Sequence, residues 1–120
     1  YMAGHSMGGA FAAKYAAKHS DEFEGVILLA AYSSVDLSDT NLNVISIYGS
    51  EDKVLNVEKY NESKKLASDF TEVIIQGGNH SGFGNYGFQS GDGEPSISSQ
   101  SQWEATVEYI MDWINQKEPE

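Results

Sequence analysis

Cysteine and arginine are both missing from this chain of 120 residues. Without cysteine there is no disulfide framework, no thiol nucleophile and no thiolate ligand for a metal. All seven basic residues are therefore lysines, and with 18 acidic residues they leave a formal net charge of −11. Because this charge repels polyanions and anionic membrane surfaces, nucleic acid is excluded as an expected partner.

Long apolar runs are missing as well. The longest, residues 26–32, is far shorter than the roughly 18 residues needed to cross a bilayer. We therefore expect no membrane span in this chain. No signal peptide is visible, and the compartment of the protein stays open.

What the chain does contain is typical of a globular protein. Apolar residues make up 40% of the sequence, with seven tyrosines and five phenylalanines. There are no internal repeats and no linker-like stretch, so residues 1–120 are expected to form a single domain. A chain of this length can bury about two-thirds of its unfolded surface.

Strand and helix patterns alternate along the chain. The run 25–31 is continuously apolar, which is typical of a parallel strand covered on both faces. The alternation predicts an α/β fold, a parallel sheet of about four strands with three helices on both of its faces. The expected strands are 1–3, 25–31, 44–48 and 71–75, and the expected helices are 9–19, 56–68 and 99–117.

The outer helices carry apolar patterns that predict their packing faces. In the first helix, Phe11 and Tyr15 are expected to pack together with the alanines around them. In the last helix, Ser99 and Gln102 predict a capping box. The helical spacing also predicts a core-facing stripe made of Trp103, Val107, Ile110, Met111 and Ile114.

Residues 4–8 read G-x-S-x-G between the first expected strand and the first helix. This context indicates a nucleophile elbow, in which Ser6 lies in a strained turn and projects its hydroxyl outward. Gly4 and Gly8 are expected where a Cβ would clash. The Met7 backbone N–H would stabilise negative charge on the reacting oxygen. The alternative is a glycine-rich turn in which Ser6 is a plain N-cap.

Two later strands are also followed by residues suited to acyl transfer. Asp52 follows the strand that ends near Tyr48, and His80 follows the strand that ends at Ile75. Because carboxyl ends of parallel strands meet at one edge of a sheet, we expect His80 within reach of both Ser6 and Asp52. Ser6 would attack, His80 would carry the proton and Asp52 would orient the imidazole.

Other polar residues compete for these roles. Glu51, Asp36 and Asp39 are alternatives to Asp52, which is favoured because it lies in a tight turn directly after a strand. The two remaining histidines, His5 and His19, are interpreted as a turn residue under the site and a helix-end cation.

The segment 81–97 is long, glycine-rich and aromatic. Such segments are usually functional or disordered. Its aromatic residues, Phe83, Tyr86 and Phe88, would form either a plug over the sheet or part of an acyl pocket, and the plug is favoured.

Three motifs in order, residues 4–9 (GHSMGG), 48–52 (YGSED) and 77–80 (GGNH), together resemble the α/β-hydrolase superfamily. The stretches 83–87 and 91–93 are similar to the tail of small bacterial hydrolases grouped near dienelactone hydrolases and simple carboxylesterases. The resemblance covers essentially the whole chain. It implies that the chain corresponds to the C-terminal half of such a domain.

Two departures from the family refine this expectation. Dienelactone hydrolases carry a cysteine nucleophile, so Ser6 favours ester chemistry. Only the last four strands of the family's larger sheet are expected here, and the loop that supplies the second oxyanion donor is absent. Met7 N–H is then the one donor that remains, and the first strand would be a bare edge.

The sequence therefore predicts a serine hydrolase that acts on small carboxylic esters through an acyl-enzyme, without metal or cofactor. Activity is expected to need the N-terminal half. One alternative is an amidase, thioesterase or peptidase that uses the same three residues. The other is a non-catalytic α/β module that forms homo-oligomers through its exposed strand edge.

Overall fold

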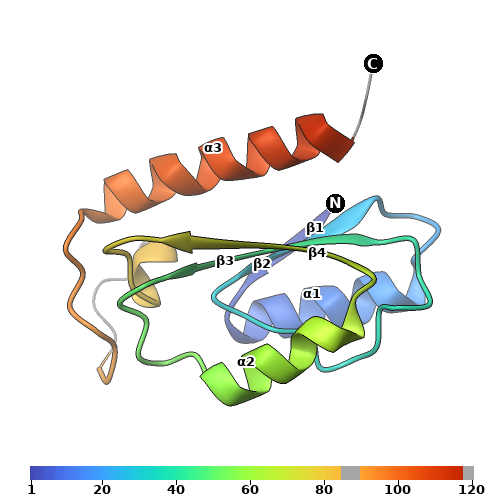
Figure 1. Cartoon of the computed structure of the whole chain (residues 1–120), viewed down its shortest axis with the longest axis horizontal. Coiled ribbons are helices and arrows are strands. Elements are labelled where there is room, and N and C mark those ends of the chain that lie inside the picture. Colours follow the sequence, from blue (N-terminus) through green and yellow to red (C-terminus); the bar gives the residue numbers. More distant parts are fainter. Residues whose placement is uncertain (85–89, 118–120) are drawn as a thin grey trace.

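The computed structural model describes residues 1–84 and 90–117. Strands and helices alternate along these residues, as the sequence predicts (Figure 1). The elements are β1 (Met2–His5), α1 (Met7–Lys18), β2 (Gly25–Leu29), β3 (Asn43–Gly49), α2 (Val57–Ser63), β4 (Asp69–Ile75) and α3 (Ser99–Lys117), with short 3₁₀ helices η1 (Lys64–Leu66) and η2 (Ser81–Phe83).

The four strands form one parallel sheet in the order β1-β2-β3-β4. Gly4 lies opposite Leu28, and Ser46 lies opposite Glu72. Helices α1 and α2 cover one face of the sheet and α3 covers the other (Figure 1). The predicted fold class, an α/β parallel sheet with helices on both faces, is confirmed.

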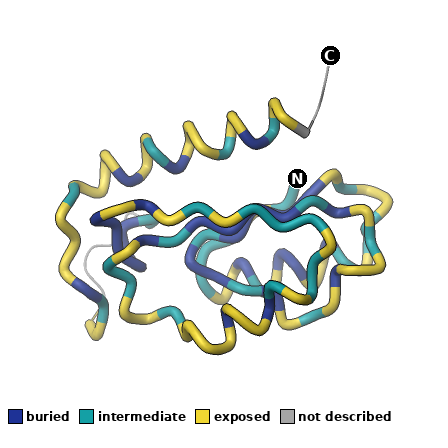
Figure 2. The backbone as a smooth tube through the Cα atoms, viewed as in Figure 1, coloured by how far each residue is buried: buried dark blue, intermediate teal, exposed yellow. Residues whose placement is uncertain are grey.

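Each face of the sheet has its own apolar core. Val26 and Leu28 of β2 pack into the core under α1, whereas Ile27 between them packs toward α3. Successive side chains of a strand point to opposite faces, so a strand buried on both faces has no polar alternation. Dark blue residues consequently run along the middle of the sheet in Figure 2. The interpretation of the apolar run 25–31 is confirmed.

The packing face of α1 differs from the expected one. Ala12, Ala13 and Ala16 are buried against the sheet, while Phe11 and Tyr15 are 64% and 50% exposed. Small side chains let the helix lie close to the sheet, so the large aromatic residues are directed outward. The prediction for Phe11 and Tyr15 is therefore wrong.

The predicted stripe on α3 is wrong in part. Trp103, Val107 and Met111 are 36%, 60% and 51% exposed. The buried face contains Gln102, Thr106 and Trp113 and adjoins the partly buried Ile110 and Ile114. The Thr106 hydroxyl donates to Gln102 O over 2.6 Å. Polar side chains can be buried when they are hydrogen-bonded. The buried face of α3 is therefore less hydrophobic in sequence than the exposed face that contains Trp103, Val107 and Met111.

The capping box at the start of α3 is also misplaced. Ser98 rather than Ser99 caps the helix, because its hydroxyl accepts a hydrogen bond from Ser101 N over 3.1 Å. The side chain of Gln102 is buried and does not cap the helix.

No helix in residues 1–84 and 90–117 combines the length and apolar character that crossing a membrane requires.

Candidate active site

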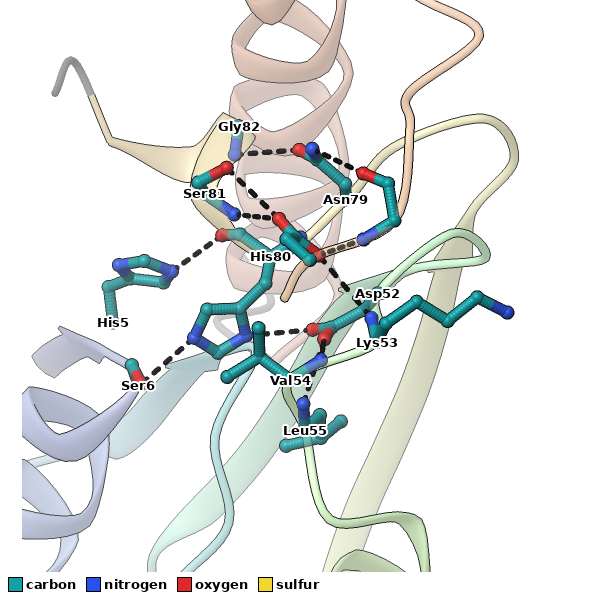
Figure 3. Close-up of polar contacts among 12 residues, drawn as sticks. His5, Ser6, Asp52, Lys53, Val54, Leu55, Asn79, His80, Ser81 and Gly82 are labelled. Atoms are coloured by element: carbon teal, nitrogen blue, oxygen red, sulfur yellow. Dashed lines mark hydrogen bonds and ion pairs between the residues drawn. The ribbon is translucent and has the colours of Figure 1, made fainter. Parts of the chain in front are cut away.

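Ser6, Asp52 and His80 come together where strands β1, β3 and β4 end (Figure 3). His80 Nε2 lies 2.9 Å from Ser6 Oγ, and His80 Nδ1 lies 2.9 Å from Asp52 Oδ2. The side chains of His80 and Asp52 are only 3% and 1% exposed. The expected contact of His80 with both partners is present in the structure.

The turn that carries Ser6 has an unusual backbone. Ser6 has φ 57° and ψ −125°, and its N–H donates to Leu29 O over 2.9 Å. Its hydroxyl makes no capping hydrogen bond to α1 and points to His80 instead (Figure 3). Positive φ is rare outside glycine and costs about 1–3 kcal/mol. Ser6 therefore precedes α1 without serving as its side-chain cap.

Close packing at this turn depends on Gly4 and Gly9. A Cβ on Gly4 would lie 2.3 Å from Gly8 O, and one on Gly9 would lie 2.5 Å from Ala31 Cβ. A Cβ on Gly8 would meet no atom of the described residues within 4 Å. The prediction of a clash is therefore correct for Gly4 and wrong for Gly8. Gly8 is exposed on the outer side of α1, whereas Gly9 is buried on the side that faces Gly4 and Ala31.

A tight turn after β3 fixes Asp52. Its Oδ1 accepts hydrogen bonds from Val54 N and Leu55 N, each over 2.8 Å, which leaves Oδ2 for His80. The competing acids do not make this contact. Asp36 accepts two hydrogen bonds from Ser38 at the surface, and Asp39 is exposed. Of the weighed acids, Asp52 has the geometry for the role.

The contacts of His80 define which of its nitrogens holds the proton. A carboxylate only accepts, so His80 Nδ1–H donates to Asp52 Oδ2. Nε2 then carries no hydrogen and accepts a hydrogen bond from the Ser6 hydroxyl. An imidazole in this tautomer can act as a general base toward the serine hydroxyl.

His5 and His19 contribute differently. His5 Nε2–H donates to the backbone oxygen of His80 over 2.8 Å, and the two rings lie 5.0 Å apart. Burial lowers the pKa of His5. His19 pairs with Glu22 over 2.8 Å at the end of α1. His5 is thus a support beneath the site, and His19 lies at a helix end, as interpreted from the sequence.

A cavity of about 350 Å³ opens beside Ser6 and His80. Ala30, which lines it, has φ 52° and donates its N–H to Ile47 O over 2.8 Å. Ser6 and Ala30 are the two non-glycine residues with positive φ in the described part of the chain, and both line this cavity. The other lining residues are Met7, Ala10, Ala31, Tyr32, Ser34, Val54, Leu55 and Asn56.

A buried amide that sequence reasoning missed supports the loop before His80. The N–H of Asn79 donates to Gln102 Oε1 over 3.2 Å, and Gln102 Nε2 donates to Asn79 O over 2.9 Å. These two hydrogen bonds connect α3 to the loop that contains His80. Its position three residues after Ser99 favoured a helix-cap interpretation, and no hydropathy pattern indicates such a contact.

Asp92 was also missed as an individual residue, although the motif 91–93 is part of the family resemblance. Its carboxylate accepts hydrogen bonds from the backbone next to the catalytic candidates.

Of the aromatic cluster, Phe83 packs 5.7 Å from His5, centroid to centroid. Tyr86 and Phe88, on which the expected plug or acyl pocket also depends, lie outside the described residues. The described residues contain no group of three or more acidic or histidine side chains arranged to hold a metal.

Comparison with known proteins supplies the family. The model of the alpha/beta hydrolase family matches residues 1–104. No match was found among curated proteins.

Similar solved structures include a predicted CIB-like hydrolase from Thermoplasma acidophilum, with a TM-score of 0.64 and 18% identity, covering 92% of this chain and 49% of that one. Est1E from Butyrivibrio proteoclasticus has a TM-score of 0.64 and 17% identity, with 95% and 60% covered. A monoacylglycerol lipase from Paleococcus ferrophilus has a TM-score of 0.61 and 14% identity, with 97% and 68% covered.

The first two of these structures are much longer than the chain, which spans 49% and 60% of their lengths. At these identities the likeness concerns the fold. The family match, by contrast, covers most of the chain and includes Ser6, Asp52 and His80. The chain belongs to the alpha/beta hydrolase family.

Proposed function

We propose that this protein is a serine hydrolase that cleaves small carboxylic esters through an acyl-enzyme. The observation that carries the proposal is the line of contacts from Ser6 Oγ through His80 to Asp52, with 2.9 Å at each step. This line is buried at the Asp52 end and opens at Ser6 into the cavity of about 350 Å³.

The proposed reaction follows from these contacts. Ser6 Oγ attacks the ester carbonyl while His80 Nε2 takes its proton, and Asp52 stabilises the imidazolium that forms. His80 returns the proton to the leaving alcohol. Water then attacks the acyl-serine with the same base, releasing the acid and restoring Ser6.

The negative charge on the carbonyl oxygen needs donors that are already in place. Met7 is the first residue of α1, and N–H groups in the first turn of a helix have no partner within the helix. We assign its N–H as one donor of the oxyanion hole. The turn 4–8 would then act as a nucleophile elbow, with Ser6 strained toward the substrate.

The cavity supports a small, uncharged substrate. No lysine, aspartate or glutamate is among its described lining residues, and Ala10, Ala30 and Ala31 give it small apolar walls. Its volume lies near the lower end of the range for ligand-binding cavities, which is about 300–1,000 Å³. An amide, thioester or peptide could react by the same steps, and an ester is less demanding than an amide or a peptide because an alkoxide leaves more readily than an amine anion.

Activity is assigned to the intact protein that contains these residues. The chain spans 49% and 60% of the first two similar structures. A second oxyanion donor would come from outside the described residues. Removing one such donor costs about 10²–10³-fold in rate, so these residues alone would be a poor enzyme.

Acyl-chain length tests the proposed substrate class. We expect the intact protein to hydrolyse p-nitrophenyl acetate and butyrate, with kcat/KM lower by more than about tenfold for the palmitate ester, because a small pocket excludes the longer chain. Ser6→Ala should abolish turnover of all three esters, while Ser34→Ala, which removes another cavity hydroxyl, should retain it. Equal rates for acetate and palmitate would contradict the assignment to small esters.

The rival function, a non-catalytic module that pairs with a second copy, has one observation in its favour. β1 is at the edge of the described sheet, beside a groove of about 530 Å³ lined mostly by apolar residues, among them Met2, Ala3 and Phe11, and by two lysines, Lys14 and Lys18. Such pairing would leave the contacts of His80 without a role. It predicts a concentration-dependent dimer in size-exclusion chromatography, and a monomer would count against it.

A further inference from the structure

We propose that Asp92 is a positioning residue whose carboxylate locks the loop of His80 to the loop of Asp52. The inference rests on the proposed function, since it concerns how His80 is held between its two partners. Asp92 does not touch the His80 ring and would act through the backbone.

Asp92 accepts several hydrogen bonds from the loop that contains His80. Its Oδ1 accepts from His80 N over 3.2 Å, and its Oδ2 accepts from Ser81 N over 2.8 Å and Ser81 Oγ over 3.0 Å. Gly93 N donates to Oδ1 over 2.8 Å. Both oxygens of Asp92 are therefore engaged, and the backbone on both sides of the His80 carbonyl is fixed.

The same carboxylate reaches the loop of Asp52. Lys53 N, the amide that follows Asp52, donates to Asp92 Oδ1 over 3.3 Å. A Cβ on Gly93 would lie 1.9 Å from Glu51 O, so the backbone after Asp92 packs directly on that loop. Asp92 therefore bridges the two segments whose separation sets the distance from His80 Nδ1 to Asp52 Oδ2.

The electrostatics agree with this role. Partial burial raises the pKa of Asp92, but hydrogen bonds from the amides of Ser81, Gly93, His80 and Lys53 outweigh it, and the pKa is lowered overall. The carboxylate is thus ionised where it is used, and hydrogen bonds to an ionised group are stronger than neutral ones.

Asparagine at position 92 would break this arrangement while keeping its shape. An amide has one accepting oxygen and one NH₂ group, which only donates. In either orientation the NH₂ group would face N–H donors: Ser81 N on one side, or His80, Gly93 and Lys53 on the other. Each such donor would then lose the carboxylate oxygen that accepts from it in the wild-type protein.

The test measures steady-state hydrolysis of p-nitrophenyl acetate by the intact protein and its variants. Asp92→Asn is expected to lower kcat by about 10²-fold, the loss that a misplacement of about 1 Å causes. KM should stay near the wild-type value because the cavity residues are unchanged. The matched control Asp36→Asn removes another carboxylate that accepts backbone and hydroxyl hydrogen bonds, in this case at the exposed surface, and should leave kcat unchanged.

Global stability is separated from positioning by Ile45→Val. This substitution of a buried core residue should lower the midpoint of urea denaturation and leave kcat near wild type. Asp92→Asn at wild-type kcat would overturn the inference, as would an equal loss in Asp36→Asn or Ile45→Val. Ser6→Ala separates the two proposals: if it stays active, the proposed function fails, whatever Asp92→Asn does.

A milder variant keeps the inference testable if Asp92→Asn does not fold. Ser81→Ala removes one of the bonds to Asp92 Oδ2 and keeps the backbone. We expect a several-fold lower kcat with KM unchanged. A wild-type kcat for Ser81→Ala, together with an unfolded Asp92→Asn, would assign Asp92 to folding alone and overturn the positioning role.

Discussion

His80→Gln is expected to lower the kcat of ester hydrolysis by about 10⁴-fold or more, because the residues around the serine act as a unit and fail together when the base is removed. Glutamine can still reach toward Ser6 but cannot take up its proton. KM should change little, since His80 forms only part of the cavity wall. Steady-state kinetics on a short p-nitrophenyl ester provide the measurement.

His19→Gln is the matched control. It removes the same imidazole from the end of α1, where His19 pairs with Glu22. We expect kcat within the error of wild type, and only a small change in thermal stability, because surface ion pairs contribute about 0–1 kcal/mol. Comparable rates for His80→Gln and His19→Gln would contradict the role given to His80.

Gly4→Ala is expected to have a large structural effect. Its Cβ would lie 2.3 Å from Gly8 O and 2.6 Å from Gly9 N, which are backbone atoms that cannot rotate away. Relief of the clash would push α1 from β1 and move Ser6 from His80. We expect a loss of about 3 kcal/mol or more in the free energy of unfolding, measured by urea denaturation, together with loss of activity.

Gly8→Ala is the contrasting substitution four residues away. A Cβ at this position meets no atom of residues 1–84 or 90–117 within 4 Å, and alanine favours a helix over glycine by about 1 kcal/mol. The variant should be as stable as wild type or slightly more so. If Gly8→Ala destabilised the protein as much as Gly4→Ala, close approach would not be the reason that glycine occupies the turn.

The fold could be predicted from local sequence patterns because strands of a parallel sheet that is covered on both faces are continuously apolar. The run 25–31 has no polar alternation, and the structure shows why: Val26 and Ile27 belong to the cores on opposite faces. The positions of Ser6, Asp52 and His80 could be predicted for a related reason. Each lies within five residues of the end of a strand, and parallel strands bring these ends to one edge.

The parts that could not be predicted depend on contacts between distant polar groups. Gln102 is buried because its amide pairs with the backbone of Asn79, 23 residues away. Asp92 accepts its hydrogen bonds from two loops that meet only in the folded chain. The roles of Gly8 and Gly9 depended on the rotation of α1 against β2, which a glycine pattern does not specify.

Labelling by a fluorophosphonate probe tests the central claim most directly, because this reagent modifies a serine that is activated as a nucleophile. Mass spectrometry of the intact protein should place one adduct on Ser6. Ser34→Ala should label normally, and both Ser6→Ala and heat-denatured protein should not label. An adduct on another serine, or labelling that persists in Ser6→Ala, would contradict the assignment of Ser6 as the nucleophile.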